Sequence, residues 1–460
     1  MWIFETNNLH LLTGEMMPSI EQKHNLHQHG PMHSVEETKS IILQSVDTLA
    51  SENKPLIDSL GQVLSKDITS HFDIPPFPNS SVDGYAVIHS DVVGASKASP
   101  IKLKVSHRVY AGETANFELE TGYSARIMTG APIPKKTSAV IPFELTNENL
   151  LNLGLNTREN YTIEIHDSPS INDNIRPQGE DIKKNTKILK RGAILKPADI
   201  GLCASIGLDS IDVFQRPKVA ILSTGNELLS PGEKFSSGKI FDSNSYSLYS
   251  SIIQAGGIPL ILGIAKDSIE SLEEKIQEAS DSDMLVTSAG VSKGDYDIVK
   301  DFLSKNGKIK LWSVNMKPGK PLAFGSLKRN NQKPLPHIGL PGNPVSSLVA
   351  FHQFVRPAIY KMMGRKTVEI PTIKAILENK IENTDGRRVY ARVFVSNKNG
   401  ELYARLSGSQ TSNVLSSMSI ANGLAICPEN IPVKNPGEIV DVQMFGWDEL
   451  ETDESLQDSN

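Results

Sequence analysis

The stretch VAILSTGNEL, residues 219–228, joins a short apolar run to a turn rich in small hydroxyl residues and glycine. Similar apolar runs recur at Pro259–Ile264, Met284–Val286, Ile309–Trp312 and Ile338–Leu340. Helical patterns separate them, near residues 246–255, 268–279, 297–303 and 344–363. Strands that alternate with helices predict a doubly wound, parallel sheet with helices on both faces. We therefore predict an α/β domain over residues 216–364.

The loops after these strands are the first candidates for a binding site, because parallel sheets bind ligands at the carboxyl ends of their strands. Glycine and small polar residues at such turns let backbone N–H groups approach an anion. One glycine-rich turn is usually only a tight turn, but four successive strand ends carry one here, at residues 223–227, 287–297, 317–321 and 340–344. The loop 241–244 precedes the next helix. No P-loop, dinucleotide-binding fingerprint, nucleophile elbow or H-E-x-x-H motif is present.

The flanking sequence divides into further domains. Ser34 and Glu37 form a capping box before a helical run to about Leu49, and a helix starts at Lys196-Pro197 and closes at Gly207. Short β-type runs fill residues 70–182 and 367–446. We predict a disordered leader (1–33), a helical linker domain I (34–69 with 183–215), a β-rich domain II (70–182), the α/β domain III (216–364), a small β domain IV (367–446) and an acidic tail (447–460).

Composition excludes several classes of protein. The formal charge is -6, and the tail alone holds six acids and no base, so a globally basic nucleic-acid-binding protein is not indicated. No apolar run approaches the roughly 20 residues that span a bilayer, and the N-terminus lacks the features of a secretory signal. Cys203 and Cys427 form no C-x-x-C motif. We expect a cytoplasmic protein that binds neither nucleic acid nor membrane.

Charge is distributed unevenly between the domains. Residues 216–364 carry a net +5 and residues 70–181 a net -5. Opposite signs suit a cleft whose basic wall attracts an anion and whose acidic wall holds a metal. Chance and ordinary attraction between domains explain the counts equally well.

Eight motifs occur in order along the chain: PPFPNSSVDGYAV (75–87), RIMTGAPIP (126–134), IRPQGEDI (175–182), STGNEL (223–228), FDSN (241–244), SAGVSKGDYD (288–297), MKPGKP (316–321) and LPGNPVS (340–346). Together they resemble the molybdopterin molybdenumtransferases, the molybdenum insertases related to the E domain of gephyrin. The resemblance runs from about Ser34 to Gly446. It implies four domains, with a molybdopterin-binding α/β domain and a C-terminal β-barrel.

The resemblance also implies an activity and its partners. Such a protein inserts molybdate into the dithiolene of adenylylated molybdopterin, with Mg²⁺ as cofactor and release of AMP. The subunits would form a homodimer in which the α/β domain faces β-rich loops of the partner subunit. Further expected partners are the upstream adenylyltransferase and the molybdoenzymes or chaperones that receive the cofactor.

Carried over to this sequence, the resemblance implies catalytic roles for Asp83, Thr129, Asp181, Glu227, Asp267, Asp297 and Lys317. The implied metal ligands are Glu227, Asp267 and Asp297. The substrate-binding candidates are Ser223, Thr224, Gly225, Asp242, Ser288, Gly290, Ser292, Gly294, Lys320, Pro341, Gly342, Asn343 and Pro344. Lys317 and Lys320 would neutralise phosphate or molybdate charge. Asp83 and Asp181 would orient water, or hold molybdate when protonated.

Several positions depart from the family pattern: Val82, Asn226, Ala289, Lys293 and Ser313. Ala289 stands where a second glycine is usual, and its loop is strained if the backbone there needs positive φ. Ser313 occupies a position that is often lysine, a loss that Lys293 in a neighbouring loop would offset.

Three alternatives remain at this stage. An adenylyltransferase would share the α/β domain but would normally lack the VDGYA and C-terminal domains. A non-enzymatic scaffold like gephyrin would tolerate neutralised sites, yet the acidic and lysine residues persist. An unrelated nucleotide-binding regulator is disfavoured by the missing nucleotide motifs.

Overall fold

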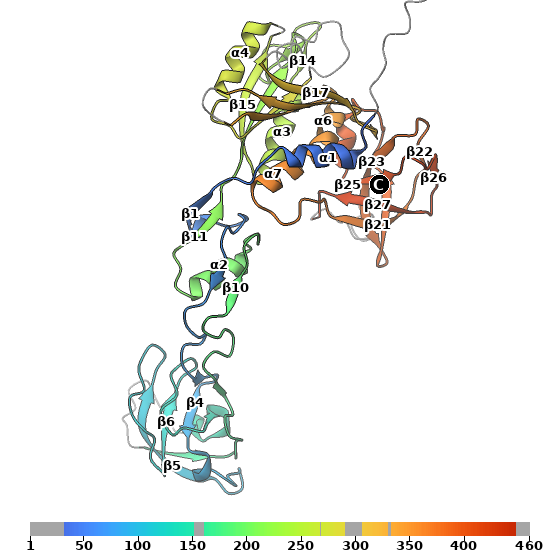
Figure 1. The fold of residues 1–460 in the computed structure, drawn as a ribbon. Helices are drawn as coiled ribbons and strands as arrows, with labels where there is room; N and C mark the ends of the chain where they lie inside the picture. Colours follow the sequence, from blue (N-terminus) through green and yellow to red (C-terminus); the bar gives the residue numbers. More distant parts are fainter. Residues whose placement is uncertain (1–31, 151–160, 267, 290–305, 330–332, 448–460) are drawn as a thin grey trace, which may run out of the picture. The chain divides into compact units, whose positions relative to one another are not determined.

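The computed structural model describes residues 32–150, 161–266, 268–289, 306–329 and 333–447. The chain divides into two compact units, drawn together in Figure 1. The first unit holds residues 1–48, 216–363 and 367–460, and the second holds residues 49–215 and 364–366. Almost all of the predicted leader and tail lies outside the described residues. No described helix is long and apolar enough to cross a membrane.

The first unit contains a six-stranded sheet in the order β15–β12–β16–β20–β19–β17. The strands are β12 (Lys218–Thr224), β15 (Ile258–Ala265), β16 (Met284–Ser288), β17 (Gly307–Ser313), β19 (Pro321–Leu327) and β20 (Leu335–Leu340). β15, β12, β16 and β20 are parallel, as predicted, whereas β19 runs antiparallel to β20 and β17. The sequence analysis did not include β19, because Pro321 and Gly325 interrupt its apolar pattern.

Helices α3 (Ser243–Gln254), α4 (Ile269–Glu278), α6 (Pro344–Ala350) and α7 (Arg356–Met362) accompany this sheet. A π-helix, Phe351–Val355, interrupts the helix predicted over residues 344–363. Asn343 stands at the N-cap of α6, but its side chain does not cap the helix and instead donates to Ser412 Oγ (3.0 Å). The helix predicted near 297–303 lies outside the described residues. Leu222, Leu262 and Leu285 are among the side chains of one buried core cluster of this domain.

Helix α1 (Val35–Gln44) begins with the predicted capping box, in which Ser34 and Glu37 each accept from the other's backbone N–H. It ends before the predicted Leu49, and the N–H of Ser45 bonds back to the Ile42 carbonyl (3.1 Å). Val35 and Ile42 are buried, and α1 packs against α7 in the first unit. Residues 34–48 thus group with the α/β domain, whereas we had grouped them with the linker domain. Helical periodicity reveals an apolar face but not which domain covers it.

The C-terminal domain is a closed β-barrel in which β23 pairs with both β24 and β25. Its strands are β18 (Met316–Lys317), β21 (Thr372–Leu377), β23 (Arg388–Lys398), β24 (Glu401–Leu406), β25 (Gly423–Cys427) and β27 (Ile439–Met444). Beside it lie β22 (Ile381–Glu382), β26 (Val433–Lys434) and α8 (Leu415–Ile420). Alternate residues such as Val393, Val395 and Val442 fill its core, as the period of two requires.

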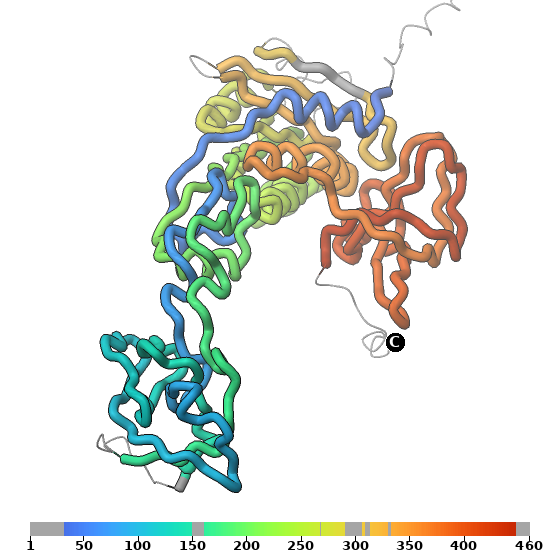
Figure 2. The backbone as a smooth tube through the Cα atoms, turned by 60° about the horizontal axis from the view of Figure 1, so that its bottom comes forward, coloured from blue at the N-terminus to red at the C-terminus, as the bar shows by residue number. Residues whose placement is uncertain are grey.

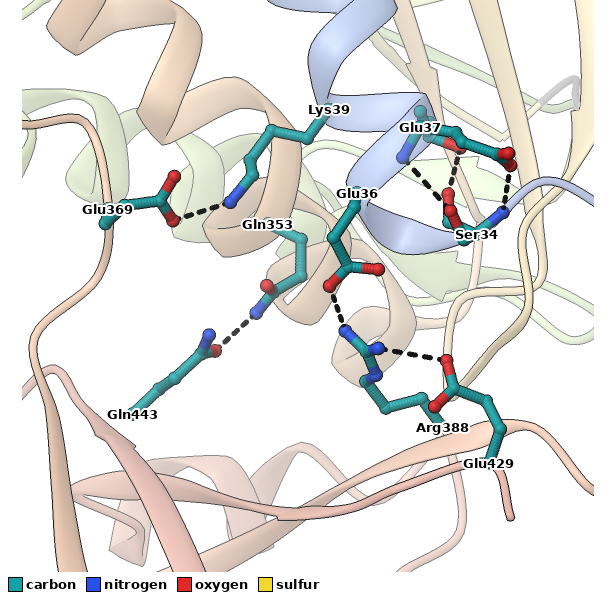
Figure 3. A network of polar contacts seen from close by, with 10 residues as sticks. Ser34, Glu36, Glu37, Lys39, Gln353, Glu369, Arg388, Glu429 and Gln443 are labelled. Carbon is teal, nitrogen blue, oxygen red and sulfur yellow. Dashed lines mark hydrogen bonds and ion pairs between the residues drawn. The ribbon is translucent and has the colours of Figure 1, made fainter.

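Polar contacts connect this barrel to the helices of the first unit (Figure 3). Arg388 of β23 contacts Glu36 of α1 and also Glu429 (3.1 Å). Gln353 of the π-helix donates to Gln443 of β27 (2.7 Å). These contacts hold the barrel against the α/β domain. Both domains contribute residues to the candidate site.

The second unit contains a five-stranded sheet in the order β7–β4–β6–β5–β8. Its strands are β4 (Gly84–Val87), β5 (Ile101–Val109), β6 (Tyr123–Ile127), β7 (Ala139–Pro142) and β8 (Tyr161–Ile165). The linker part consists of the pairs β1 (Ser51–Pro55) with β11 (Ser210–Phe214) and β2 (Ile68–Thr69) with β10 (Lys187–Leu189), and of α2 (Pro197–Ser205). Figure 2 shows these two passes of the chain side by side, in blue and green. The predicted start of α2 at Pro197 and its closure at Gly207 (φ 79°) are confirmed.

Candidate functional site

A pocket of about 550 Å³ lies at the carboxyl ends of the parallel strands, and we call it the strand-end pocket. This volume suits a small-molecule site. Seven of the predicted residues line it: Glu227, Asp242, Ser288, Pro341, Gly342, Asn343 and Pro344. Other lining residues were not predicted as individual site residues, although Leu228, Phe241 and Asn244 belong to the quoted motifs; Ile240 and Asn413 lie outside them. Ile240 and Phe241 form the short strand β14, which pairs with β13 (Leu228–Leu229).

Three predicted binding residues, at the end of β12 and directly after it, do not line this pocket. Ser223 and Thr224 are buried, with 1% and 4% of their surface exposed, and neither lines it. Ser223 Oγ instead contacts Ser245 Oγ of α3 (2.9 Å). Gly225 adopts φ 143°, and a Cβ there would lie about 2.5 Å from the Glu227 carboxylate. These residues shape the loop that presents Glu227.

The first turn of α3 reaches the pocket. Asp242 caps the helix, since its carboxylate accepts from Ser245 N (3.0 Å) and Ser245 Oγ (2.6 Å). Asn244 is buried and its Nδ2 donates to Ser288 Oγ (2.7 Å) and to the Gly342 carbonyl (2.8 Å). The N-terminus of a helix is a favourable place for a phosphate group.

Ala289, directly after β16, also lines the pocket and has φ 73°. This is the left-handed region, which L-residues other than glycine rarely adopt. The strain that we expected for positive φ at this position is therefore present.

A second pocket of about 740 Å³ lies between the α/β domain and the barrel, and we call it the cationic cleft. Five of its lining residues are basic: Lys317, Lys320, Lys380, Arg387 and Arg392. Pro321 and Asn343 line both pockets, so the two adjoin.

Arg392 of β23 is the most deeply buried cation of the cleft, with 1% of its surface exposed. Its guanidinium donates only to neutral oxygens: Ser417 Oγ (3.2 Å) and the carbonyls of Ser409 (2.7 Å) and Thr411 (3.1 Å). No carboxylate in the described parts of the chain pairs with it. Burial lowers the pKa of Arg392 to about 10, because the charged form loses its hydration. An arginine among the apolar residues of YARVFV is a signal that the sequence analysis could have used.

The predicted lysines occupy the rim of the cleft. Lys317 Nζ lies 3.8 Å from Asp385 Oδ2, and Arg387 contacts the same carboxylate. The hydrogen bond from Arg387 is the main reason why the pKa of Asp385 lies below its usual value. The Lys320 ammonium has no hydrogen-bond or ion-pair partner among the described residues.

In the second unit, two predicted site residues, Asp83 and Thr129, are hydrogen-bonded to each other. Asp83 Oδ1 accepts from Thr129 N (2.7 Å) and Thr129 Oγ1 (2.8 Å). These hydrogen bonds lower the pKa of Asp83, which disfavours the protonated form that we had considered. Gly84 begins β4 rather than forming a turn, and a Cβ there would lie 2.1 Å from the Ile141 carbonyl oxygen. Asp181 is exposed, and its N–H donates to the Ile74 carbonyl (3.0 Å).

Arg126 forms an ion pair with the buried Glu148, and the positive charge of Arg126 contributes to lowering the pKa of Asp83. Arg126 donates through Nε (3.0 Å) and Nη2 (2.9 Å) to one oxygen of Glu148. Tyr85 donates to the other oxygen, and Arg126 also covers the Phe143 ring at 4.4 Å. Burial disfavours the charged guanidinium, but Glu148 outweighs it and the pKa of Arg126 is raised.

Several predicted residues lie outside the described residues: Asp267, Asp297, Gly290, Ser292 and Gly294, together with Lys293. The described residues contain no cluster of three or more potential metal ligands. Glu227 could supply one metal ligand, because its carboxylate is exposed at the strand-end pocket and has no hydrogen bond or ion pair within the described ranges.

Comparison with known proteins matches almost the whole described chain. Residues 33–207 match the family described as MoeA N-terminal region (domain I and II), residues 220–361 a probable molybdopterin binding domain, and residues 374–445 the MoeA C-terminal region (domain IV). The molybdopterin molybdenumtransferase 2 of Mycobacterium tuberculosis is 32% identical over 424 residues, which are 91% of this chain and all of that protein. The chain belongs to the molybdopterin molybdenumtransferase family.

Other relatives agree with this assignment. The molybdopterin molybdenumtransferase of Haemophilus influenzae is 33% identical over 90% of this chain and 99% of its own length. The crystal structure of a molybdopterin biosynthesis MoeA protein from Pyrococcus horikoshii is 32% identical, with a TM-score of 0.75 over 91% of this chain and all of that one. The recognised family and the predicted multidomain α/β and β fold are therefore confirmed, and the chain is a transferase of molybdenum cofactor biosynthesis by family.

Proposed function

We propose that this protein inserts molybdate into the dithiolene of adenylylated molybdopterin and releases AMP. The observation that carries the proposal is the pair of adjoining pockets at one edge of the sheet. One is a small-molecule pocket at the N-terminus of α3 and the other is lined by five basic residues. The reaction needs both an organic phosphate ester and an inorganic oxyanion at neighbouring positions.

In this proposal the adenylylated molybdopterin occupies the strand-end pocket. The N-terminal turns of α3 and α6 lie there and favour the phosphate groups. Phe241 at the pocket offers an aromatic face to a planar ring. Among the described residues, the acidic ones that line it are Glu227 and Asp242. Since Asp242 is engaged as a helix cap, Glu227 is the carboxylate left for a metal.

Molybdate occupies the cationic cleft. A buried arginine that lacks a carboxylate partner has an unbalanced charge, and an oxyanion would balance it. Arg392 provides this charge at the base of the cleft, and Lys317 and Lys320 add ammonium groups at its rim. Together these three cations position the molybdate and stabilise its negative charge while dithiolene sulfurs replace its oxygen ligands.

Mg²⁺ would be held by Glu227 together with Asp267 and Asp297, and when bound it supplies positive charge to the phosphoryl oxygens of the adenylate. Asp83 remains ionised because Thr129 donates to it, so in this proposal Asp83 accepts a hydrogen bond from water. Asp181 is proposed to act with it.

The protein is further proposed to act as a homodimer. Helix α3 and β15 expose a set of apolar side chains: Tyr246, Tyr249, Ile253, Ile258, Leu260 and Ile261. β15 is the last strand of its sheet, no described strand pairs with its other edge, and it has no charged residue to protect it. Such a surface suits a subunit interface. Ile253→Glu should shift the sedimentation equilibrium towards the monomer.

The test incubates the purified protein with adenylylated molybdopterin, molybdate and Mg²⁺. We expect molybdate-dependent AMP release together with a product that reconstitutes an apo-molybdoenzyme. Asp83→Ala should keep AMP binding and lose turnover, while Lys102→Ala, which removes an exposed ion pair with Glu164 in the same domain, should leave turnover unchanged. If the adenylate binds but neither product appears, the scaffold interpretation replaces this proposal. If ATP and molybdopterin are consumed instead, the protein is an adenylyltransferase.

A further inference from the structure

Asn244 joins two loops that the sequence separates by more than fifty residues. Its side chain is 9% exposed, and Nδ2 donates to Ser288 Oγ at the end of β16 and to the Gly342 carbonyl after β20. A carbonyl can only accept, so the geometry fixes which end of the amide faces the two loops. Both loops line the strand-end pocket.

Ala289 lies between the two residues that Asn244 holds. It follows Ser288 directly, and its N–H donates to the Leu340 carbonyl (3.1 Å). Its methyl group packs over Gly342, where an added Cβ would lie 3.3 Å away. With φ 73°, Ala289 has a conformation that its own side chain disfavours, so the surrounding contacts must hold it there.

We propose that Asn244 is a positioning residue that keeps Ala289 in the left-handed conformation and so fixes the pocket wall formed by Ser288, Ala289 and Gly342. The identity of the ligand rests on the proposed function, but the positioning role does not. Asn244 is not needed to cap α3, because Asp242 makes the cap. The amide therefore acts between the loops.

The role of Asn244 depends on its two N–H donors. Asn244→Asp keeps the shape and the Oδ1 acceptor but loses both donors, whereas Asn244→Leu loses donors and acceptor alike. Asn244 Oδ1 has no hydrogen-bond partner among the described residues, so a direct contact with the ligand through this oxygen is the competing explanation. A direct contact would spare Asn244→Asp and harm Asn244→Leu.

The experiment is a double-mutant cycle between Asn244→Asp and Ala289→Gly, with AMP as the probe in calorimetric titrations. Glycine adopts positive φ without strain. Asn244→Asp should therefore weaken AMP binding about 5- to 30-fold in the wild-type background, the range expected for one left-handed residue. In the Ala289→Gly background it should weaken binding less than about 3-fold. Ser251→Ala, which removes a hydrogen bond within α3 (2.7 Å), is the matched control and should change neither value.

Thermal unfolding without ligand is an independent test. Here Asn244→Asp should have the smaller effect in the wild-type background, whereas its effect on AMP binding should be larger there. In the wild-type background, Asn244→Asp lets Ala289 leave its strained conformation, and this relief offsets part of the stability lost. In the Ala289→Gly background there is no strain to relieve. The fall in the unfolding midpoint caused by Asn244→Asp should therefore be about 2–4 °C smaller in the wild-type background. The positioning role would be overturned if Asn244→Asp lowered AMP affinity equally in both backgrounds. It would also be overturned if Asn244→Asp left AMP affinity unchanged while Asn244→Leu lowered it. If the wild-type protein does not bind AMP, the proposed function fails, and the thermal arm still decides the role of Asn244.

Discussion

Arg126 and Arg392, two arginines in different domains, have opposite surroundings. Arg126 in the second unit pairs with Glu148, a carboxylate that is itself 8% exposed, and its pKa is raised. Arg392 in the barrel has only neutral partners, and its pKa falls to about 10. The first charge is balanced within the fold, and the second has no balancing charge among the described residues. The difference between the two is the reason why we propose an anionic ligand at Arg392 and not at Arg126.

The largest effect is expected from breaking the balanced pair. Arg126→Met leaves the Glu148 carboxylate buried without a cation, so it should destabilise the second unit by about 3–5 kcal/mol. Urea unfolding followed by circular dichroism measures this loss. Adding Glu148→Gln to the same chain should restore much of the stability, and a double variant no more stable than the single one would contradict the account.

Removing the unbalanced cation should act on function rather than on folding. Arg392→Met takes away the charge that holds the oxyanion, so molybdate-dependent AMP release should fall about 100-fold, as for the loss of one oxyanion donor. The unfolding midpoint should stay the same or rise, because a desolvated charge is removed. Lys374→Met, an exposed ion-pair residue of the same barrel, is the control. A strongly destabilised Arg392→Met with normal turnover would make Arg392 a structural residue like Arg126.

A smaller effect, on molybdate affinity, is expected from Asp385 at the rim of the cationic cleft. Asp385 lies near Lys317 and contacts Arg387, so it partly neutralises the cations that an oxyanion would meet. Asp385→Asn should therefore tighten molybdate binding several-fold at low salt, with a smaller gain at high salt because rim charges are screened. Titration calorimetry at two salt concentrations tests this. Weaker binding would show that Asp385 positions Lys317 instead of competing with the ligand.

The smallest effect extends the comparison to a carboxylate. Thr129 lowers the pKa of Asp83, so the native state binds its proton less readily than the unfolded chain does. The resulting stability is present above the ordinary pKa near 3.8 and is lost as the pH falls through the lowered value. Asp83→Asn should therefore reduce the decrease of the thermal unfolding midpoint between about pH 6 and about pH 2. If Asp83→Asn left the pH dependence of the thermal midpoint unchanged at acid pH, the Thr129 hydrogen bonds would not stabilise the protein in the way described.

The sequence predicted the parallel part of the sheet, since apolar runs alternate with helical patterns, and it predicted the strand ends as a ligand site. It missed β19, because Pro321 and Gly325 break the strand pattern. It predicted that Ser223 and Thr224 bind the ligand, whereas both are buried and neither lines the strand-end pocket. It included Asn244 only as part of the FDSN motif and gave Arg392 no role, because the hydrogen-bond partners of both lie outside their local sequence pattern. Residue type and spacing identify strand ends but not which side chains face the pocket.

The most direct test of the central claim is a crystal structure of the protein with tungstate, whose anomalous scattering locates an analogue of molybdate. The account predicts a peak in the cationic cleft, within hydrogen-bond distance of the Arg392 guanidinium, that disappears in Arg392→Met. A well-occupied tungstate elsewhere, with Arg392 still bonded only to Ser417, Ser409 and Thr411, would contradict the claim.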